Sequence, residues 1–207
     1  MNVHSKWCFM KNDTDRLNKK ERIIEAAVII FAHKGFYNAT VKDVALKAGV
    51  ADGTIYNYFK NKDDLLISLF EQKMEAILDR FQKSIDSVDN PAGKLVHLIH
   101  THFEIIEEDC RLAEVFQVEL RQSSKFLKNY HNQKFSDFLN MISSIIKTGK
   151  ADGSFRTDLD VDVIKVMIFG SIDEVARQWI LGASEKYNLR SAANQIVTVI
   201  CEGVLKR

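Results

Sequence analysis

Proline, cysteine and glycine are all scarce in this sequence of 207 residues. Pro91 is the one proline, the nine glycines fall mostly at segment ends, and the three cysteines (Cys8, Cys110 and Cys201) stand far apart. An odd, widely spaced set of cysteines cannot form a disulfide framework and is typical of reduced thiols inside a cell. The composition, 46% apolar and 28% charged, excludes intrinsic disorder and collagen-like repeats.

Long apolar runs and catalytic motifs are also missing. No stretch of 18 apolar residues is present, and the first residues, MNVHSKWCFMKNDTD, lack the apolar core of a secretory signal. GxSxG, Walker and GxGxxG patterns do not occur. His97, His100 and His102 do not share a helix face, because His102 would lie about 160° from His100 at 100° per residue. We therefore expect a cytoplasmic protein that is not an enzyme and holds no metal or cofactor.

The net charge of +1 conceals an asymmetry between the two ends of the chain. Residues 1–62 contain 11 Lys and Arg against 6 Asp and Glu, a net charge of +5. Residues 63–207 contain 18 against 22, a net charge of −4. A basic N-terminal segment joined to a larger acidic body is typical of a protein that binds a polyanion at one end only.

The apolar residues recur at three- and four-residue spacing and strand patterns are nearly absent, which predicts an all-α fold. Capping-box patterns at Asn18–Glu21 and Thr40–Asp43 begin two helices, which end at Gly35 and Gly49. Asp52 is expected to cap a third, very short helix. The sequence therefore places three short helices near the N-terminus.

A much longer helix follows, capped by Asn61. Its roughly 25 residues extend nearly 40 Å at 1.5 Å per residue, so we expect it to connect two packed units. Five further helices are expected over about 91–108, 110–121, 123–149, 159–182 and 188–205. The expected organisation is a loose extension (1–17), a helix-turn-helix domain (18–63) and a helical effector-binding and dimerisation domain (64–207).

The second and third helices have the length and the glycine-containing turn of a helix-turn-helix unit. Their apolar positions form a small shared core and leave polar and aromatic side chains outward on the third helix: Thr54, Tyr56, Asn57 and Tyr58. Such groups can contact base edges in a major groove. Phosphate contacts are expected from the residues that flank this surface: Thr40, Lys42, Lys60 and Lys62.

The segments Thr40–Ala45, Ala48–Val50 and Gly53–Lys62 resemble the DNA-binding signature of the TetR family of bacterial repressors. The resemblance covers residues 17–77 closely and extends to the helix count of the rest. It implies that the helix at about 52–58 is the recognition helix and that the protein binds a palindromic operator as a homodimer. It also implies DNA contacts by Thr54, Tyr56, Asn57, Tyr58 and Lys62.

The helices expected at 159–182 and 188–205 are apolar on nearly every face. Because such helices cannot keep a solvated side, a second surface must cover them. That surface is either another part of the same chain or the same helix pair of a second copy. The TetR resemblance favours the dimer, for which the expected interface residues are Val166, Gly170, Trp179, Ile196, Ile200 and Val204.

A narrower resemblance concerns the effector. Glu119–Ser123, Ile168–Glu174, Trp179 and Lys186–Leu189 resemble the FadR-type subgroup of TetR repressors, which repress fatty-acid degradation genes and release DNA on binding long-chain acyl-CoA. This ligand needs an apolar tunnel and cations at its mouth. The expected ligand residues are Phe103, Phe116, Glu119, Arg121, Gln122, Lys125, Lys128, Tyr130, Met141, Ile145, Phe169, Asp173 and Arg177. Effector binding is expected to tilt the long helix and change the spacing of the two recognition helices.

Two other functions stay open on the residues alone. The body could bind a cationic aromatic drug, with counter-charges and stacking faces from Glu119, Asp173, Glu174, Trp179 and Phe103. Alternatively, residues 159–205 could bind a partner helix in a protein that never contacts nucleic acid. The basic N-terminal segment disfavours this last hypothesis.

Overall fold

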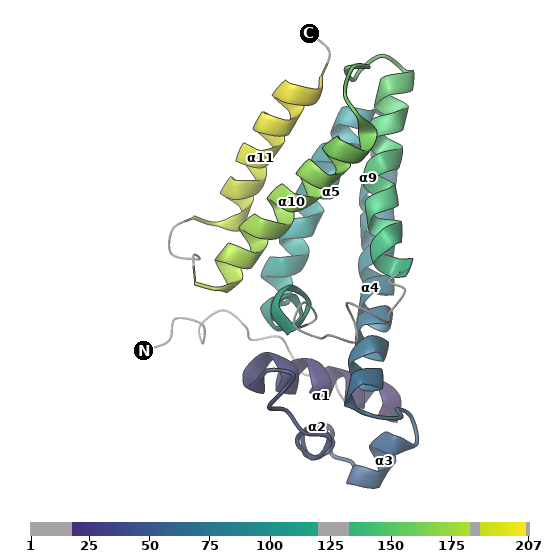
Figure 1. The fold of residues 1–207 in the computed structure, drawn as a ribbon, viewed down its shortest axis with the longest axis vertical. Coiled ribbons are helices and arrows are strands. Elements are labelled where there is room, and N and C mark those ends of the chain that lie inside the picture. The colour runs from purple at the N-terminus through teal and green to yellow at the C-terminus, as the bar shows by residue number, and fades with distance from the viewer. Residues whose placement is uncertain (1–17, 120–132, 183–186, 206–207) are drawn as a thin grey trace. The chain divides into compact units, whose positions relative to one another are not determined.

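The computed structural model describes residues 18–119, 133–182 and 187–205 (Figure 1). Within these ranges the regular structure is helical, apart from one isolated bridge between Phe155 and Leu205, so the all-α prediction is confirmed. The chain divides into two compact units. Unit 1 comprises Met1–Lys73 and Glu108–Tyr130, and unit 2 comprises Met74–Glu107 and His131–Arg207.

Unit 1 contains four helices, a π-helical turn and the start of a long helix. The helices are α1 (Lys19–Lys34), α2 (Val41–Ala48), α3 (Asp52–Tyr56), the first turns of α4 (Lys62–Asp86), α6 (Cys110–Glu114) and the π-helical turn η3 (Val115–Glu119). Helix α1 packs against α2, α6 and η3, and α2 packs against α3. Fully enclosed side chains of this core include Phe31, Ile55, Phe59 and Leu65.

Local capping fixes the ends of the first two helices as the sequence predicts. The Asn18 side chain accepts a hydrogen bond from the Glu21 N–H, and the Glu21 carboxylate accepts one from the Asn18 N–H. The same reciprocal pair joins Thr40 and Asp43 at the start of α2. Gly49 ends α2 in the left-handed region, at φ 65° and ψ 41°, where a side chain would be strained.

The third helix differs from its prediction. Asp52 does not cap α3; Ala51 occupies the N-cap position and makes no side-chain hydrogen bond there. The helix also ends at Tyr56 instead of residue 58, because the next residues close tighter turns, with Tyr58 N–H donating to the Ile55 carbonyl. Asn61 does cap α4, accepting a hydrogen bond of 2.9 Å from the Asp64 N–H.

Unit 2 is built from the longer helices: the rest of α4, α5 (Pro91–Glu108), α9 (Gln133–Ala151), α10 (Val161–Ile180) and α11 (Leu189–Val204). Helix α10 packs against both α9 and α11. The core of unit 2 is apolar and partly aromatic, with Leu95, Leu98, Ile99, Phe103, Phe138, Ile142, Ile168 and Ile172 buried. None of the helices described here has the length and apolar character that a membrane span requires.

The helix expected over 110–121 is not a continuous α-helix. It is α-helical only over Cys110–Glu114 and widens to π-helical geometry over Val115–Glu119. Periodicity cannot reveal such a change, because one extra residue per turn alters the apolar pattern only slightly over five residues. The predicted start of the next helix, residue 123, lies outside the described part of the chain.

Candidate functional site

Helix α3 and the turn after it expose a row of aromatic and amide side chains. Ile55 and Phe59 are buried and anchor the segment, while Tyr56 is 58% exposed, Tyr58 is 43% exposed and Asn57 is also exposed. These three side chains therefore point away from the core, as the sequence predicts. Such groups on a short helix and the turn after it fit the dimensions of a DNA major groove. Their contact with DNA stays a prediction.

Helix α2 adds an exposed face, of which the sequence predicted Lys42 but not Leu46. Lys42 and Leu46 are four residues apart, so they lie on the same side of the helix, opposite the buried Val44 and Ala48. Leu46 is 83% exposed, the highest value among the large apolar side chains that the structure describes. Its position could have been found from the sequence, because the buried positions of α2 leave Leu46 on the outer face.

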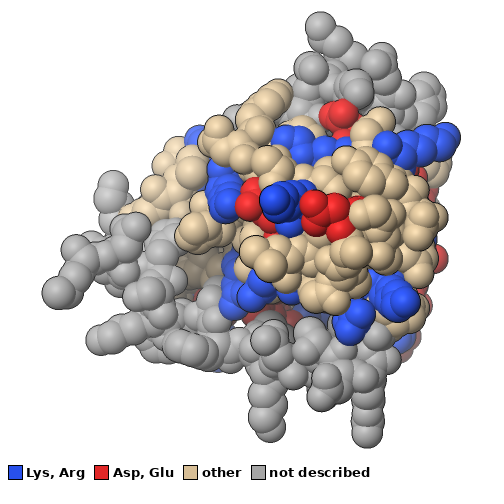
Figure 2. Space-filling model, turned by 90° about the horizontal axis from the view of Figure 1, so that it is seen from below, with Lys and Arg blue, Asp and Glu red and all other residues tan. Residues whose placement is uncertain are grey.

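The residues that flank this surface include several lysines. Lys42 and Lys60 are exposed, and neither makes an ion pair with any residue that the structure describes. Figure 2 views the chain from the end at which Figure 1 shows α2 and α3, and there Lys and Arg side chains are spread around the face, with acidic groups among them near its centre. Free ammonium groups of this kind can contact phosphates.

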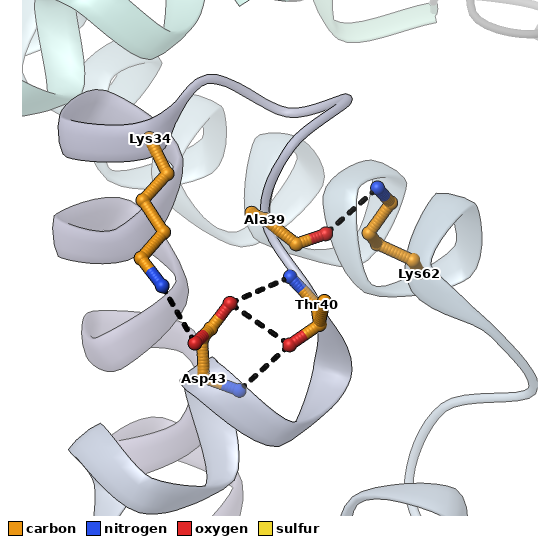
Figure 3. A network of polar contacts seen from close by, with 5 residues as sticks. All are labelled: Lys34, Ala39, Thr40, Asp43 and Lys62. Carbon is orange, nitrogen blue, oxygen red and sulfur yellow. Dashed lines mark hydrogen bonds and ion pairs between the residues drawn. The ribbon is translucent and has the colours of Figure 1, made fainter.

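Thr40 holds the start of α2 in place (Figure 3). Its hydroxyl donates to the Asp43 carboxylate at 2.8 Å and accepts from the Asp43 N–H at 3.1 Å. The other carboxylate oxygen of Asp43 pairs with the Lys34 ammonium at 2.7 Å. The hydrogen bonds from Lys34 and Thr40 hold the pKa of Asp43 down at about 2. Thr40 is exposed, so a phosphate contact stays a prediction, but its hydroxyl already has a capping role.

Lys62 was predicted to contact a DNA phosphate, but its ammonium is bound within the protein. Its ammonium donates to three backbone carbonyls in the turn between α1 and α2: Phe36 at 2.6 Å, Tyr37 at 3.1 Å and Ala39 at 2.9 Å. The bond to Ala39 is drawn in Figure 3. The ammonium also lies 4.6 Å from the centre of the Phe36 ring. Because a lysine has three N–H donors, none is left in this structure for the predicted phosphate contact.

The residues expected to bind an effector fall into three groups. Phe103, Met141, Ile145, Phe169, Asp173 and Arg177 belong to unit 2, whereas Phe116 belongs to unit 1, where its ring lies 5.0 Å from that of Phe70. The remaining predicted residues lie outside the described part of the chain: the side chain of Glu119 and all of Arg121, Gln122, Lys125, Lys128 and Tyr130. Their roles stay predictions.

Within unit 2, aromatic rings from four helices lie close together. The Phe81 ring on α4 lies 4.9 Å from Phe138 on α9, and Phe138 lies 6.2 Å from Phe169 on α10. Phe103 is buried nearby on α5, within 5.3 Å of the His102 ring. This interior is therefore apolar and aromatic.

Met141 and Ile145 line a different feature. They border an open groove of about 340 Å³ between the ends of α4, α5 and α9. Most of the other lining residues are polar or charged: Gln82, Asp86, Lys94, Asp137, Asn140, Ser144 and Thr148. The groove therefore lacks the apolar wall of the predicted tunnel.

Arg177 is not a free cation. Its guanidinium makes two hydrogen bonds to the Glu174 carboxylate, at 2.6 Å and 2.8 Å, one turn away on α10. These bonds raise the pKa of Arg177. The positive charge predicted to meet a CoA phosphate is thus already matched within its own helix.

His102 is a residue of the interior that the sequence analysis did not assign. Its ring stacks near Phe81 and Phe138, and its Nε2 atom is enclosed with no hydrogen-bond partner among the described residues. Burial lowers its pKa to about 4, although the Asp173 charge and a hydrogen bond to the backbone of Ile172 act the other way. The imidazole is therefore neutral at pH 7. In the part of the chain described here, no cluster of His, Cys, Asp and Glu is arranged to hold a metal ion.

Helices α10 and α11 leave aliphatic side chains uncovered. Val163, Val166, Met167 and Val199 are large, apolar and exposed. Of the predicted interface residues, Val166 and Gly170 are exposed and Trp179, Ile196 and Ile200 are half-buried. Val204 is only 4% exposed and its carbonyl accepts a hydrogen bond from the Arg156 N–H. Val204 therefore belongs to the core of its own chain and offers almost no surface to a partner.

Comparison with known proteins places these features in a family. Residues 23–69 match the family described as bacterial regulatory proteins, tetR family, and residues 70–203 match the C-terminal region of YsiA-like proteins. The chain is 39% identical to the fatty acid metabolism regulator protein of Bacillus subtilis over 186 residues, which are 90% of this chain and 95% of that protein.

Two solved structures are similar to this chain in both fold and sequence. FadR from Bacillus subtilis in complex with stearoyl-CoA has a TM-score of 0.83 and 39% identity, covering 88% of this chain and 98% of its own. The fatty acid degradation regulator FadR from Bacillus halodurans has a TM-score of 0.82 and 38% identity, with the same coverage. The chain therefore belongs to the TetR family of bacterial transcriptional regulators.

Proposed function

We propose that this protein represses fatty-acid degradation genes by binding a palindromic operator as a homodimer, and that long-chain acyl-CoA releases it from DNA. The observation that carries the proposal is the outward row Tyr56, Asn57 and Tyr58 on a helix-turn-helix unit, in a chain similar over nine-tenths of its length to a fatty acid metabolism regulator. This role is regulatory and needs no catalytic group. Its place of action is the cytoplasm, where bacterial DNA lies.

DNA reading is assigned to α3 and the residues beside it. The phenols of Tyr56 and Tyr58 and the amide of Asn57 are free of the core, so they can reach base edges without unfolding the unit. Lys42 and Lys60 neutralise phosphates on either side and set the register of the helix in the groove. Lys62 supports this surface indirectly, by holding the turn that leads into α2.

Dimerisation is assigned to the uncovered aliphatic face of α10 and α11. Val163, Val166, Met167 and Val199 would be costly to leave in water, and a second copy of the same face covers them. A two-fold contact of this kind gives two equivalent recognition helices. Two equivalent helices read a palindrome, because each half-site presents the same sequence to its protomer.

The effector site is assigned to the aromatic interior of unit 2. FadR from Bacillus subtilis was solved in complex with stearoyl-CoA, and the rings of Phe81, Phe138 and Phe169 offer an apolar surface for an acyl chain here. Helix α4 contributes residues to both units, so a change of its tilt couples the two. The ligand lowers operator affinity only to the extent that it binds one tilt more tightly than the other.

The DNA-binding half of the proposal is tested by selecting operators from random duplexes and measuring affinity by fluorescence anisotropy. We expect a palindromic site, an affinity that falls steeply with salt, and a loss of about tenfold to a hundredfold in Tyr56→Ala. Tyr187→Phe is the matched control, since Tyr187 lies in unit 2 and donates only to the Val175 carbonyl. Selection of no palindrome, or unchanged binding by Tyr56→Ala, would contradict the reading surface.

The effector half is tested on the operator complex with stearoyl-CoA, free stearate, CoA and ethidium. We expect stearoyl-CoA alone to raise the melting temperature of the protein and to release the operator. Release by ethidium in place of stearoyl-CoA would reassign the interior to cationic aromatic compounds. Release by CoA alone would show that the acyl chain is not what the protein senses.

A further inference from the structure

The interior of unit 2 contains one polar atom that no described residue satisfies. Buried polar side chains are few there, and Thr101 shares a hydrogen bond of 2.7 Å with Ser84. His102 Nε2 is enclosed and unpartnered. Leaving a buried nitrogen without a partner is costly, so such an atom indicates a partner that is absent from the structure.

The protonation of the imidazole ring determines whether the missing partner is a hydrogen-bond donor or an acceptor. The backbone of Ile172 favours the charged form of His102, as a carbonyl beside a ring N–H does. Because Nε2 is the enclosed nitrogen without a partner, we assign the N–H of the neutral ring to Nδ1. Burial keeps the ring neutral, so Nε2 carries a lone pair and no proton. The missing partner is therefore an N–H or O–H donor.

The surroundings of Nε2 restrict this donor further. The rings of Phe81 and Phe138 lie nearly parallel to the imidazole, at 6.5 Å and 6.4 Å, and Phe103 meets it edge-on at 5.3 Å. Asp173, only 8% exposed, also acts on the ring electrostatically. An apolar enclosure beside a buried carboxylate disfavours an anionic head group and favours a neutral donor attached to an apolar chain.

We propose that His102 Nε2 accepts a hydrogen bond from the effector at the junction between its acyl chain and its polar head. In acyl-CoA the donor closest to the thioester is the first amide N–H of the pantetheine arm. A protonated fatty acid carries a comparable O–H donor. The inference rests on the proposed function, and it identifies His102 as the polar group that sets the position of the head along the aromatic interior.

The test compares matched variants by isothermal titration with stearoyl-CoA. His102→Phe keeps the ring volume and removes the acceptor, so affinity falls about tenfold. His102→Gln places an amide oxygen near the position of Nε2 and keeps affinity within about threefold of the unaltered protein. His100→Phe makes the same substitution two residues away on α5 and leaves affinity unchanged. The ligand-free His102→Phe protein melts at the same or a higher temperature, because it no longer buries an unpaired nitrogen.

A second pair of ligands identifies the donor. The decanoyl thioester of N-acetylcysteamine carries the amide N–H, and the S-ethyl decanoyl thioester lacks it. The unaltered protein binds the first more tightly, and His102→Phe removes that preference. If decanoic acid instead shows the loss in His102→Phe, the carboxyl O–H is the donor.

The outcomes separate the inference from the function on which it rests. Equal affinity of the His102→Phe and unaltered proteins for stearoyl-CoA, or an unchanged thioester preference in His102→Phe, overturns the role of His102 and leaves the repressor function in place. Failure of the unaltered protein to bind stearoyl-CoA at all overturns both.

Discussion

Acidification is expected to destabilise unit 2 through His102. In the unfolded chain the imidazole has its usual pKa of 6.5, whereas burial lowers the pKa in the folded protein to about 4. Between these two values the unfolded chain binds a proton that the folded protein excludes. The free energy of unfolding therefore falls as the pH drops from 6.5 to 4 and changes no further through this group below pH 4.

The size of the effect follows from the two pKa values. One pKa unit corresponds to about 1.36 kcal/mol, so the full difference amounts to about 3 kcal/mol below pH 4. At pH 4.5 the expected loss is about 2–3 kcal/mol, and above pH 7.5 it is close to zero. A loss of this size is a large fraction of the stability of an ordinary domain.

Urea unfolding at pH 7.5 and pH 4.5 measures this loss. The sequence has two tryptophans, and in a Trp7→Phe background the fluorescence of Trp179 reports on unit 2. The background protein should lose about 2–3 kcal/mol more on acidification than the same protein with His102→Phe, at equal protein concentration. Titrating carboxylates are common to both proteins and cancel. His100→Phe should keep the larger loss. Equal losses with and without His102 would refute the argument.

Further substitutions at four positions probe the roles that the structure gives to single residues. Lys62→Met should lower the free energy of unfolding, measured in urea, by about 3 kcal/mol, because three carbonyls lose a charged donor. Lys60→Met should leave stability unchanged. It should reduce the slope of the logarithm of operator affinity against the logarithm of salt concentration by about one. Thr40→Ala should cost about 1 kcal/mol of stability by removing the cap of α2, and Thr40→Ser should keep it; equal melting temperatures for these two variants would contradict the capping role. Gly170→Leu should weaken the dimer in analytical ultracentrifugation without destabilising the monomer, since a Cβ at Gly170 meets nothing within 4 Å in its own chain.

Features set by neighbours in sequence were predictable. The two capping boxes join residues three apart, and Gly49 adopts the left-handed conformation that ends α2. The outward direction of Tyr56 and Asn57 followed from the buried positions around them, because a helix fixes the directions of successive side chains. These relations depend on local geometry alone.

Features set by distant residues were not predictable. Lys62 donates to carbonyls 23 to 26 positions earlier in the chain, and no local pattern marks which lysine will do so. His102 interacts with Phe81 and Phe138 on two other helices, so its missing partner becomes apparent only when those helices pack around it. In the sequence, Val204 resembles the other apolar residues of α11. Only the folded structure shows that it is buried within its own chain and not available to the predicted interface.

Unit 1 is not a contiguous piece of the polypeptide. The chain leaves it after Lys73 in the middle of α4 and returns at Glu108 to supply α6 and η3, which pack against α1. An N-terminal fragment ending at residue 73 would uncover the apolar side of α1 and the ring of Phe70, which otherwise meets Phe116. Chimeras that exchange DNA specificity between related regulators must therefore transfer both stretches, residues 1–73 and 108–130. Otherwise the transferred part exposes apolar surface and aggregates.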